Sequence, residues 1–200
     1  MISERLKIFA VAGEASGDIL GAQALQAVNN TLGAENVTLR GVGGENMQAC
    51  GLNSLYPMTD LSVMGLAEIL PALPRLLGRL DETTRAVERF APDILLTIDS
   101  PDFNFRLVPK IRKRMGRQAP RCVHIVAPSV WAWRPGRAAH IAEFLDQLLC
   151  LLPIEPPYFE AEGLPSACIG HPAARNVASD PGAGSAFRQR HGLPETGRIL

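Results

Sequence analysis

An aspartate that directly follows a run of apolar residues is the first candidate for chemistry in this 200-residue sequence. Asp99 comes immediately after the run Ile94–Ile98. If that run is a buried strand, a partly shielded carboxylate on rigid backbone stands at its end, which suits a general base. Asp102 and Asn104 more simply cap the helix that follows. Two carboxylates without a third ligand make a weak cation site, so we expect no metal.

The stretch SVWAWR, from Ser129 to Arg134, holds both tryptophans of the chain. A buried strand would use Val or Ile where Trp131 and Trp133 stand. Flat aromatic faces beside a guanidinium suit a surface that binds a ligand. The alternative is that the two indoles pack the loop itself.

The stretch AGEASGD follows another apolar run and matches neither G-x-G-x-x-G, nor a P-loop, nor the G-x-S-x-G elbow of hydrolases. It predicts a tight turn from a strand into a helix. In one interpretation Ser16 or Asp18 caps that helix. In the other, the backbone N–H groups around Gly17 and the Ser16 hydroxyl bind a ligand oxygen, with Glu14 as an acceptor. The two interpretations are compatible.

A leucine-rich segment places six large apolar residues at helical spacing. They are Leu66, Ile69, Leu70, Leu73, Leu76 and Leu77. Pro71 and Pro74 interrupt the pattern and favour a kinked flap. The stripe either faces the core of the protein or forms an exposed rim that docks on anionic lipid, helped by Arg75, Arg79 and Arg85. The periodicity does not decide between them.

The histidines predict less. His124 lies within an apolar run and is expected to be a buried histidine with its hydrogen bonds satisfied. His171 ends another run, where it could contact a ligand or close a turn. His140 and His191 fall in helical, exposed patterns.

Composition excludes several classes of protein. Lys plus Arg and Asp plus Glu both number 20, so whole-chain charge offers no attraction to nucleic acid. Cysteines lie far apart, and those in apolar runs, Cys122, Cys150 and Cys168, are expected to be reduced core thiols. The first residues make a poor signal peptide, and no run is long enough to span a bilayer. We therefore expect a cytoplasmic protein whose membrane contact is peripheral.

Apolar runs of four to six residues alternate with helical patterns along the chain. Continuous apolarity is typical of strands covered on both faces, so the alternation predicts an α/β fold with a Rossmann-like, doubly wound parallel sheet of about six strands. Ligands of such sheets bind beyond the carboxyl ends of the strands. The polar and aromatic loops described above all follow strands, which predicts one cleft.

Six strings in order, VAGEASGDILGA, GVGG, LSVMGLAEIL, IDSPDFN, PSVWAWR and GHP, resemble the lipid-A-disaccharide synthases from about Lys7 to His171. The resemblance implies the N-terminal half of a two-domain GT-B glycosyltransferase that inverts configuration without metal or cofactor. Its donor would be UDP-2,3-diacylglucosamine and its acceptor 2,3-diacylglucosamine 1-phosphate. The products would be a β-1,6-linked disaccharide 1-phosphate and UDP.

The same resemblance assigns roles to residues. Asp99 is the expected base, and Trp131, Trp133 and Arg134 would line the acceptor cleft. The leucine-rich segment becomes a rim on the cytoplasmic face of the inner membrane, and a homodimer is left open. The expected substrate contacts are Glu14, Ser16, Gly17, Asp18, Asn104, Ser129, Trp131, Trp133, Arg134 and His171.

The predicted domains are an acceptor- and membrane-facing domain over residues 1–172 and, over 173–200, an interdomain segment with the start of a truncated nucleotide-binding domain. Arg175 stands where the family usually has an acidic residue. The UDP-binding half would lie beyond Leu200, so we expect no turnover by these 200 residues alone. The alternative is a non-catalytic module that binds the lipid acceptor. A UDP-sugar epimerase is disfavoured by the SVWAWR and AGEASGD strings.

Overall fold

The computed structural model describes residues 5–62, 66–132, 136–172, 174 and 182–197, with the side chains of 66–72 left out. It divides into two compact units, Met1–Ile169 and Gly170–Leu200, which are described separately. The predicted boundary at residue 172 stays a prediction.

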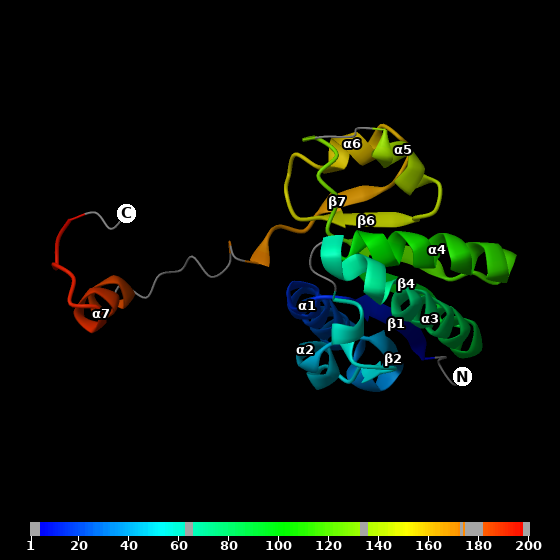
Figure 1. The fold of residues 1–200 in the computed structure, drawn as a ribbon, viewed down its shortest axis with the longest axis horizontal. Coiled ribbons are helices and arrows are strands. Elements are labelled where there is room, and N and C mark those ends of the chain that lie inside the picture. Colours follow the sequence, from blue (N-terminus) through cyan, green and yellow to red (C-terminus); the bar gives the residue numbers. More distant parts are fainter. Residues whose placement is uncertain (1–4, 63–65, 133–135, 173, 175–181, 198–200) are drawn as a thin grey trace. The chain divides into compact units, whose positions relative to one another are not determined.

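The first unit is built on a seven-stranded parallel sheet (Figure 1). Its strands are β1 (Leu6–Ala12), β2 (Val37–Val42), β3 (Asn53–Ser54), β4 (Ile94–Ile98), β5 (Arg121–Ile125), β6 (Gln147–Cys150) and β7 (Ser166–Cys168). They lie in the order β3-β2-β1-β4-β5-β6-β7, and every pairing is parallel. The predicted α/β class is confirmed. The expected six strands omit β3, because a two-residue strand has no hydrophobic pattern to detect.

Helices cover both faces of the sheet. They are α1 (Ala15–Leu32), α2 (Glu45–Ala49), α3 (Leu66–Phe90), α4 (Pro101–Met115), α5 (Arg137–Ala142) and α6 (Pro156–Glu160), with short 3-10 turns η1 (Ala34–Asn36), η2 (Met58–Asp60) and η3 (Gly116–Gln118). Side chains of β1 alternate between two cores. Phe9 and Val11 pack with residues of α3 to α6, whereas Ile8 and Ala10 pack with those of α1 and α2. The sheet is therefore doubly wound, as predicted.

Helix α3 differs from the expected kinked flap. It runs unbroken from Leu66 to Phe90 through both prolines. Proline inside a helix removes a backbone hydrogen bond and costs about 3 kcal/mol. The second half of α3 contains no proline and contributes Leu80 and Val87 to the core. This packing stabilises the helix.

The cysteines are free thiols. Cys122 and Cys150 are buried, and burial raises the pKa of their thiols to about 11 and about 12. Cys168 is exposed, so its predicted place in the core is wrong. It lies on β7, the edge strand of the sheet that the described residues form.

The second unit contains the helix α7 (Ala183–Arg190). None of its residues is buried. The Arg188 guanidinium donates to the carbonyl oxygens of Pro194 and Gly197, both at 2.7 Å, and folds the following segment back onto the helix.

Candidate functional site

The strand order changes direction at β1, whose neighbours are β2 and β4. In a doubly wound sheet this switch point is where loops diverge and leave room for a ligand. Here the diverging loops begin at Gly13 and Asp99. At their starts the two loops are in close contact, because a Cβ placed on Gly13 would come within 2.5 Å of the Ser100 hydroxyl oxygen. Glycine is therefore required at the turn into α1.

The turn from β4 into α4 is strained. Asp99 and Ser100 both have left-handed backbone, with φ of 49° and 44°, which costs a non-glycine residue about 1–2 kcal/mol. The Asn104 amide stabilises this turn by donating to the carbonyl oxygen of Asp99 over 2.7 Å. The Asp99 N–H donates to Ile125 on β5 over 3.0 Å. Asp99 itself is half-buried and is not among the residues that line the cavity described below.

Asn104 therefore does not cap α4 as the sequence suggested, and its substrate contact stays a prediction. Its side chain is fully buried and stabilises the turn through the hydrogen bond to Asp99. No side-chain hydrogen bond caps α4 at Ser100. Asp102, the other predicted cap, is exposed and faces a cavity instead.

That cavity has a volume of about 300 Å³ and opens beside the Asp99–Ser100 turn. Its walls come from the β1–α1 turn, the end of η2, the middle of α3 and the start of α4. Most of the lining is apolar: Leu61, Leu73, Leu76, Leu77, Leu80, Pro101 and Phe103. The polar lining residues are Glu14, Ser100, Asp102 and Arg106. An apolar hollow with a few convergent polar groups is the usual form of a small-molecule site.

The leucine-rich segment divides between the two predicted environments. Leu73 and Leu77 are 40% and 47% exposed and line the cavity, while Leu76 is half-buried against the core. The side chains of Leu66, Ile69 and Leu70 lie outside the described residues. The described part of the segment thus forms both a cavity wall and an apolar surface.

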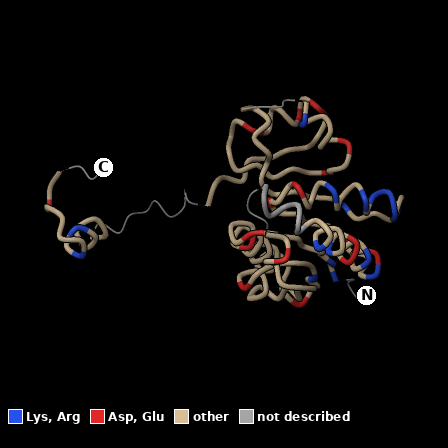
Figure 2. The backbone as a smooth tube through the Cα atoms, in the orientation of Figure 1, with Lys and Arg blue, Asp and Glu red and all other residues tan. Residues whose placement is uncertain are grey.

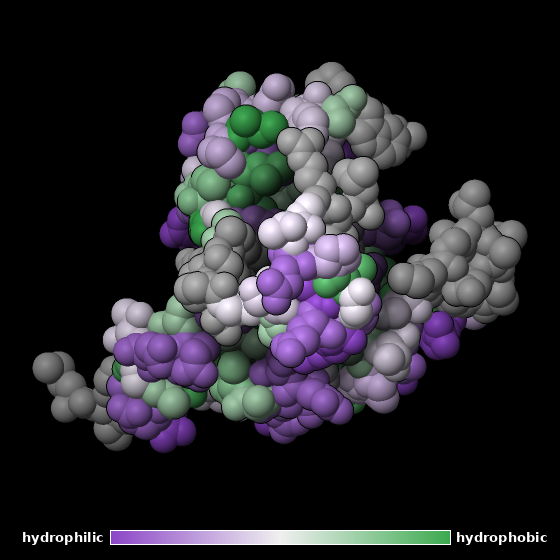
Figure 3. Space-filling model, turned by 90° about the vertical axis from the view of Figure 1, so that its left-hand side faces the viewer, coloured by the Kyte–Doolittle hydropathy of each residue, from purple (hydrophilic) through white to green (hydrophobic). Residues whose placement is uncertain are grey.

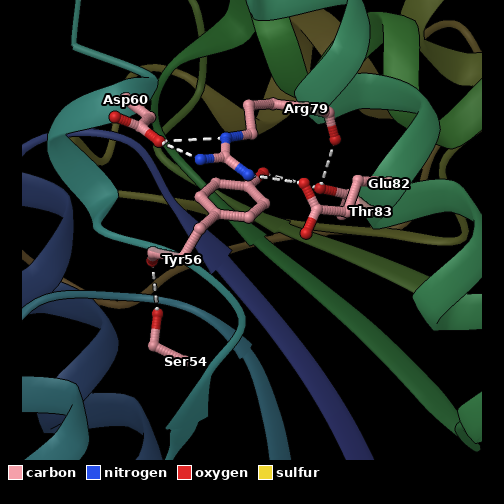
Figure 4. A network of polar contacts seen from close by, with 6 residues as sticks. All are labelled: Ser54, Tyr56, Asp60, Arg79, Glu82 and Thr83. Atoms are coloured by element: carbon pink, nitrogen blue, oxygen red, sulfur yellow. Dashed lines mark hydrogen bonds and ion pairs between the residues drawn. The ribbon is translucent and has the colours of Figure 1, made fainter.

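A polar network fixes α3 against the segment that precedes it (Figure 4). Arg79 donates to Asp60 and to Glu82, and its guanidinium stacks 4.3 Å from the ring centre of Tyr56. The Tyr56 hydroxyl lies 2.6 Å from that of Thr83, and burial raises the pKa of Tyr56 to about 12. Hydrogen bonds to Glu82 and Asp60 raise the pKa of Arg79. This network holds the leucine wall in place.

Arg79 is consequently not available to anionic lipid, as one interpretation of the sequence required. Charges of both signs are mixed along α3, whereas α4 has one acidic residue near its start and basic residues after it (Figure 2). Ion pairs between these two helices join Lys110 to Asp81 and Arg114 to Glu88. Arg75 and Arg85 are exposed on α3 and carry no ion pair among the described residues.

Asp18 has a structural partner that the sequence did not indicate. It is 3% exposed, and its carboxylate accepts four hydrogen bonds of 2.8–3.1 Å, from the backbone N–H groups of Gly44, Asn46 and Met47 and from the Asn46 amide. It thus caps α2 rather than its own helix α1, whose N-cap residue Glu14 forms no side-chain cap hydrogen bond. Gly17 is also buried, where it packs against Ala12 and Ile98, whereas Ser16 is exposed.

His124 is buried as predicted, but its hydrogen bonds are only half satisfied. Nδ1 lies 2.7 Å from the Thr97 hydroxyl, while Nε2 has no hydrogen-bond partner. Burial lowers the pKa of His124 to about 3. Two more buried atoms without partners, Ser100 Oγ and Asn104 Oδ1, belong to the turn after β4. Unsatisfied buried polar atoms are costly, and of these three residues Ser100 lines the cavity.

The SVWAWR stretch is described only in part. Val130 is buried and anchors the loop, and Trp131 is 42% exposed beside the exposed Ser129. Neither Ser129 nor Trp131 lines the cavity. Trp133 and Arg134 lie outside the described residues, as does Arg175. His171 is exposed and belongs to the second unit, so its predicted meeting with the other loops is untested.

A second apolar surface, missed in the sequence, follows β6. Leu152, Ile154 and Tyr158 are 38–52% exposed. Figure 3 shows hydrophobic colour in the upper part of the view, at the height where Figure 1 places α5 and α6. Leu61, Leu80, Phe103 and Arg106 of the cavity were also missed. Arg106 carried a signal, because it stands four residues after Asp102 on one helix face.

In the part of the chain that the structure describes, no cluster of three His, Cys, Asp or Glu side chains could hold a metal ion. None of the described helices is long and apolar enough to cross a bilayer.

The sheet order and the hollow at its switch point define a Rossmann-like α/β domain with a site for a partly apolar ligand. The family model described as lipid-A-disaccharide synthetase matches residues 8–200. The chain belongs to this family, as its six sequence strings predicted.

Curated relatives agree. A lipid-A-disaccharide synthase of Rhodospirillum centenum is 52% identical over 98% of this chain and 48% of its own length. Those of Paramagnetospirillum magneticum and Pseudomonas aeruginosa PAO1 are 49% and 41% identical, over 96% and 100% of this chain and 48% and 51% of their own lengths. The chain spans about half the length of these relatives.

Proposed function

We propose that this chain forms the acceptor-binding half of an enzyme that joins UDP-2,3-diacylglucosamine to 2,3-diacylglucosamine 1-phosphate. The observation that carries the proposal is the position of the leucine-lined cavity, whose wall includes Ser100, the residue directly after Asp99. An acyl chain in that cavity would hold its sugar beside the Asp99 carboxylate. The curated relatives bear the name of this activity.

In the proposed reaction, Asp99 accepts the proton of the acceptor 6-hydroxyl. The oxygen attacks the anomeric carbon of the donor as the bond to UDP breaks, and the bonding electrons leave with the UDP oxygen. One displacement at that carbon inverts its configuration and gives a β-1,6 linkage. The carboxylate also stabilises the positive charge that develops on the sugar. The departing UDP needs cations and N–H donors, and we assign these to the second half of the full-length relatives.

Leu73 and Leu77 extend the proposal to the membrane. Both are exposed and both line the cavity, so a bilayer that covers them would be continuous with the place where acyl chains enter. Arg75 and Arg85 on the same helix would meet anionic headgroups. We propose peripheral binding to the cytoplasmic face of the inner membrane through this surface.

Binding of the acceptor tests the proposal. The 200-residue chain is titrated with neutral-detergent micelles that carry 2,3-diacylglucosamine 1-phosphate, and separately with deacylated glucosamine 1-phosphate. We expect saturable binding that weakens by at least about tenfold without acyl chains, since each buried methylene contributes about 0.8 kcal/mol. Equal binding of the two compounds would refute the acceptor site. Turnover is then tested with a radiolabelled donor after this chain is fused to the remaining half of the Rhodospirillum centenum relative. Acceptor binding by that fusion without product favours the alternative of a non-catalytic lipid-binding module.

A further inference from the structure

The cavity contains one cation, Arg106, among its described lining residues. Arg106 stands on α4, and its side chain is exposed at the cavity wall. Three other basic residues of α4, which do not line the cavity, form ion pairs. Lys110 pairs with Asp81, Arg112 with Asp146 and Arg114 with Glu88.

Arg106 forms no ion pair or side-chain hydrogen bond within the described residues. Asp102 lies one helical turn earlier, at the spacing where Asp and Arg commonly pair, and it lines the same cavity. The two side chains nevertheless do not meet within 4.0 Å. The guanidinium therefore faces an apolar wall with its donors unused.

We propose that Arg106 binds the phosphate monoester of an acylated sugar, and so selects the phosphorylated acceptor over the same lipid without phosphate. This inference rests on the proposed function. A guanidinium offers paired N–H donors that match two phosphate oxygens. Arg106 stands five positions after Pro101, which is about 7.5 Å along the axis of α4. The phosphate is thereby bound away from Asp99, at the far side of the sugar.

The two carboxylates of the cavity, Glu14 and Asp102, favour a sugar phosphate over a simple anionic lipid. They accept hydrogen bonds but offer none, and a phosphate without hydroxyl groups would meet them only as like charges. Besides the 6-hydroxyl assigned to Asp99, the acylated sugar has two donors for them, the 4-hydroxyl and the N–H of the 2-acylamino group. The combination of two acceptors, one cation and an apolar wall fits a ligand with acyl chains, hydroxyl groups and one phosphate.

Three lipids in neutral-detergent micelles separate these features. They are 2,3-diacylglucosamine 1-phosphate, 2,3-diacylglucosamine without phosphate, and phosphatidic acid, which has a phosphate monoester and acyl chains but no hydroxyl group. Binding to the unaltered chain is compared with binding to Arg106→Gln and to Arg106→Lys. Lys113→Gln is the matched control, because Lys113 is an exposed cation on α4 that does not line the cavity.

We expect the unaltered chain to prefer the phosphorylated glycolipid to the unphosphorylated one by about tenfold or more, the size of a charge-assisted hydrogen bond pair. It should bind phosphatidic acid more weakly than the phosphorylated glycolipid, because phosphatidic acid offers no hydroxyl donor to Glu14 and Asp102. Arg106→Gln should remove the preference between the two glycolipids while leaving the unphosphorylated one bound as before. Arg106→Lys should keep part of it, and Lys113→Gln all of it. Unchanged thermal unfolding of the Arg106 variants would show that the loss is local.

Three results overturn the inference in distinguishable ways. If both glycolipids bind equally well and Arg106→Gln changes neither, the phosphate site is wrong and the acceptor cavity stands. If phosphatidic acid binds as tightly as the glycolipid phosphate, or Lys113→Gln weakens binding as much as Arg106→Gln, the effect is general attraction to anionic lipid. If the unaltered chain binds neither glycolipid, the proposed function fails and the inference fails with it.

Discussion

The side-chain amide of Asn104 donates a 2.7 Å hydrogen bond to the backbone carbonyl of Asp99, and it does so from a fully buried position. The turn that carries the proposed base is thus held by a residue one turn along α4. Asn104→Ala should lower the free energy of unfolding by about 2 kcal/mol, because it removes this bond and leaves a buried carbonyl unpaired. Urea unfolding measures the change. A loss below about 0.5 kcal/mol would mean that the left-handed turn needs no support from Asn104.

Asp18→Ala tests whether the AGEASGD stretch is partly structural. The substitution leaves the N-terminal N–H groups of α2 without their acceptor, so we expect a loss of about 2 kcal/mol or more in the free energy of unfolding. Ser16→Ala on the same helix is the control, since Ser16 is exposed, and it should change stability by less than about 0.5 kcal/mol. Equal effects of the two substitutions would contradict the assignment of Asp18 as the cap of α2.

His124 predicts a loss of stability in acid. Burial keeps it neutral down to a pKa of about 3, whereas the unfolded chain takes up a proton below about pH 6.5. The unfolded state then binds more protons, so the contribution is fully present above pH 6.5 and is lost as pH falls. Between pH 7.5 and pH 5 it amounts to about 2 kcal/mol.

Urea unfolding of the unaltered chain and of His124→Gln at both pH values measures this contribution. Carboxylates titrate alike in the two proteins, so the difference between their pH dependences isolates His124. The variant should lose about 2 kcal/mol less on acidification than the unaltered chain. Parallel pH profiles would show that His124 is protonated in the folded state as readily as in the unfolded one.

Leu73 and Leu77 should carry binding to membranes. The double variant Leu73→Asp/Leu77→Asp is expected to lower co-sedimentation with anionic phospholipid vesicles by at least about tenfold, because two leucines lose their burial in lipid. Leu32→Asp is the matched control, since Leu32 is a leucine of similar exposure (45%) on α1 and lines no part of the cavity. If Leu32→Asp releases the protein equally, the α3 surface is not the docking site.

The class of the fold was predictable because its six longer strands are continuous apolar runs with turn residues between them. Strand β3 was not, since Asn53 and Ser54 join the sheet only through backbone pairing with Arg40 and Gly41. The continuity of α3 through Pro71 and Pro74 was also missed. The local preference of proline predicts a break in the helix there. The tertiary contacts of Arg79 and Leu80 that stabilise the helix cannot be predicted from its hydrophobic periodicity.

The role of Asp99 stays a prediction, and most of the cavity walls were missed. Asp99 directly follows a strand, so its place at the edge of the sheet could be predicted from the neighbouring residues alone. Asp18 looked like a ligand contact because its partners, Gly44 to Met47, lie 26 to 29 residues further along the chain. Arg106 looked like one more surface charge. Only the packing of α3 against α4 shows that Arg106 faces an apolar cavity and forms no ion pair with a described residue.

The role of Asp99 is tested most directly by turnover. This chain is fused to the remaining half of the Rhodospirillum centenum relative, and the fusion is assayed with radiolabelled UDP-2,3-diacylglucosamine and saturating acceptor. Asp99→Asn should reduce kcat by at least about 10²-fold, the usual contribution of a general base, with acceptor binding and the unfolding midpoint unchanged. A kcat within about threefold of the unaltered fusion would contradict the assignment of Asp99 as the base.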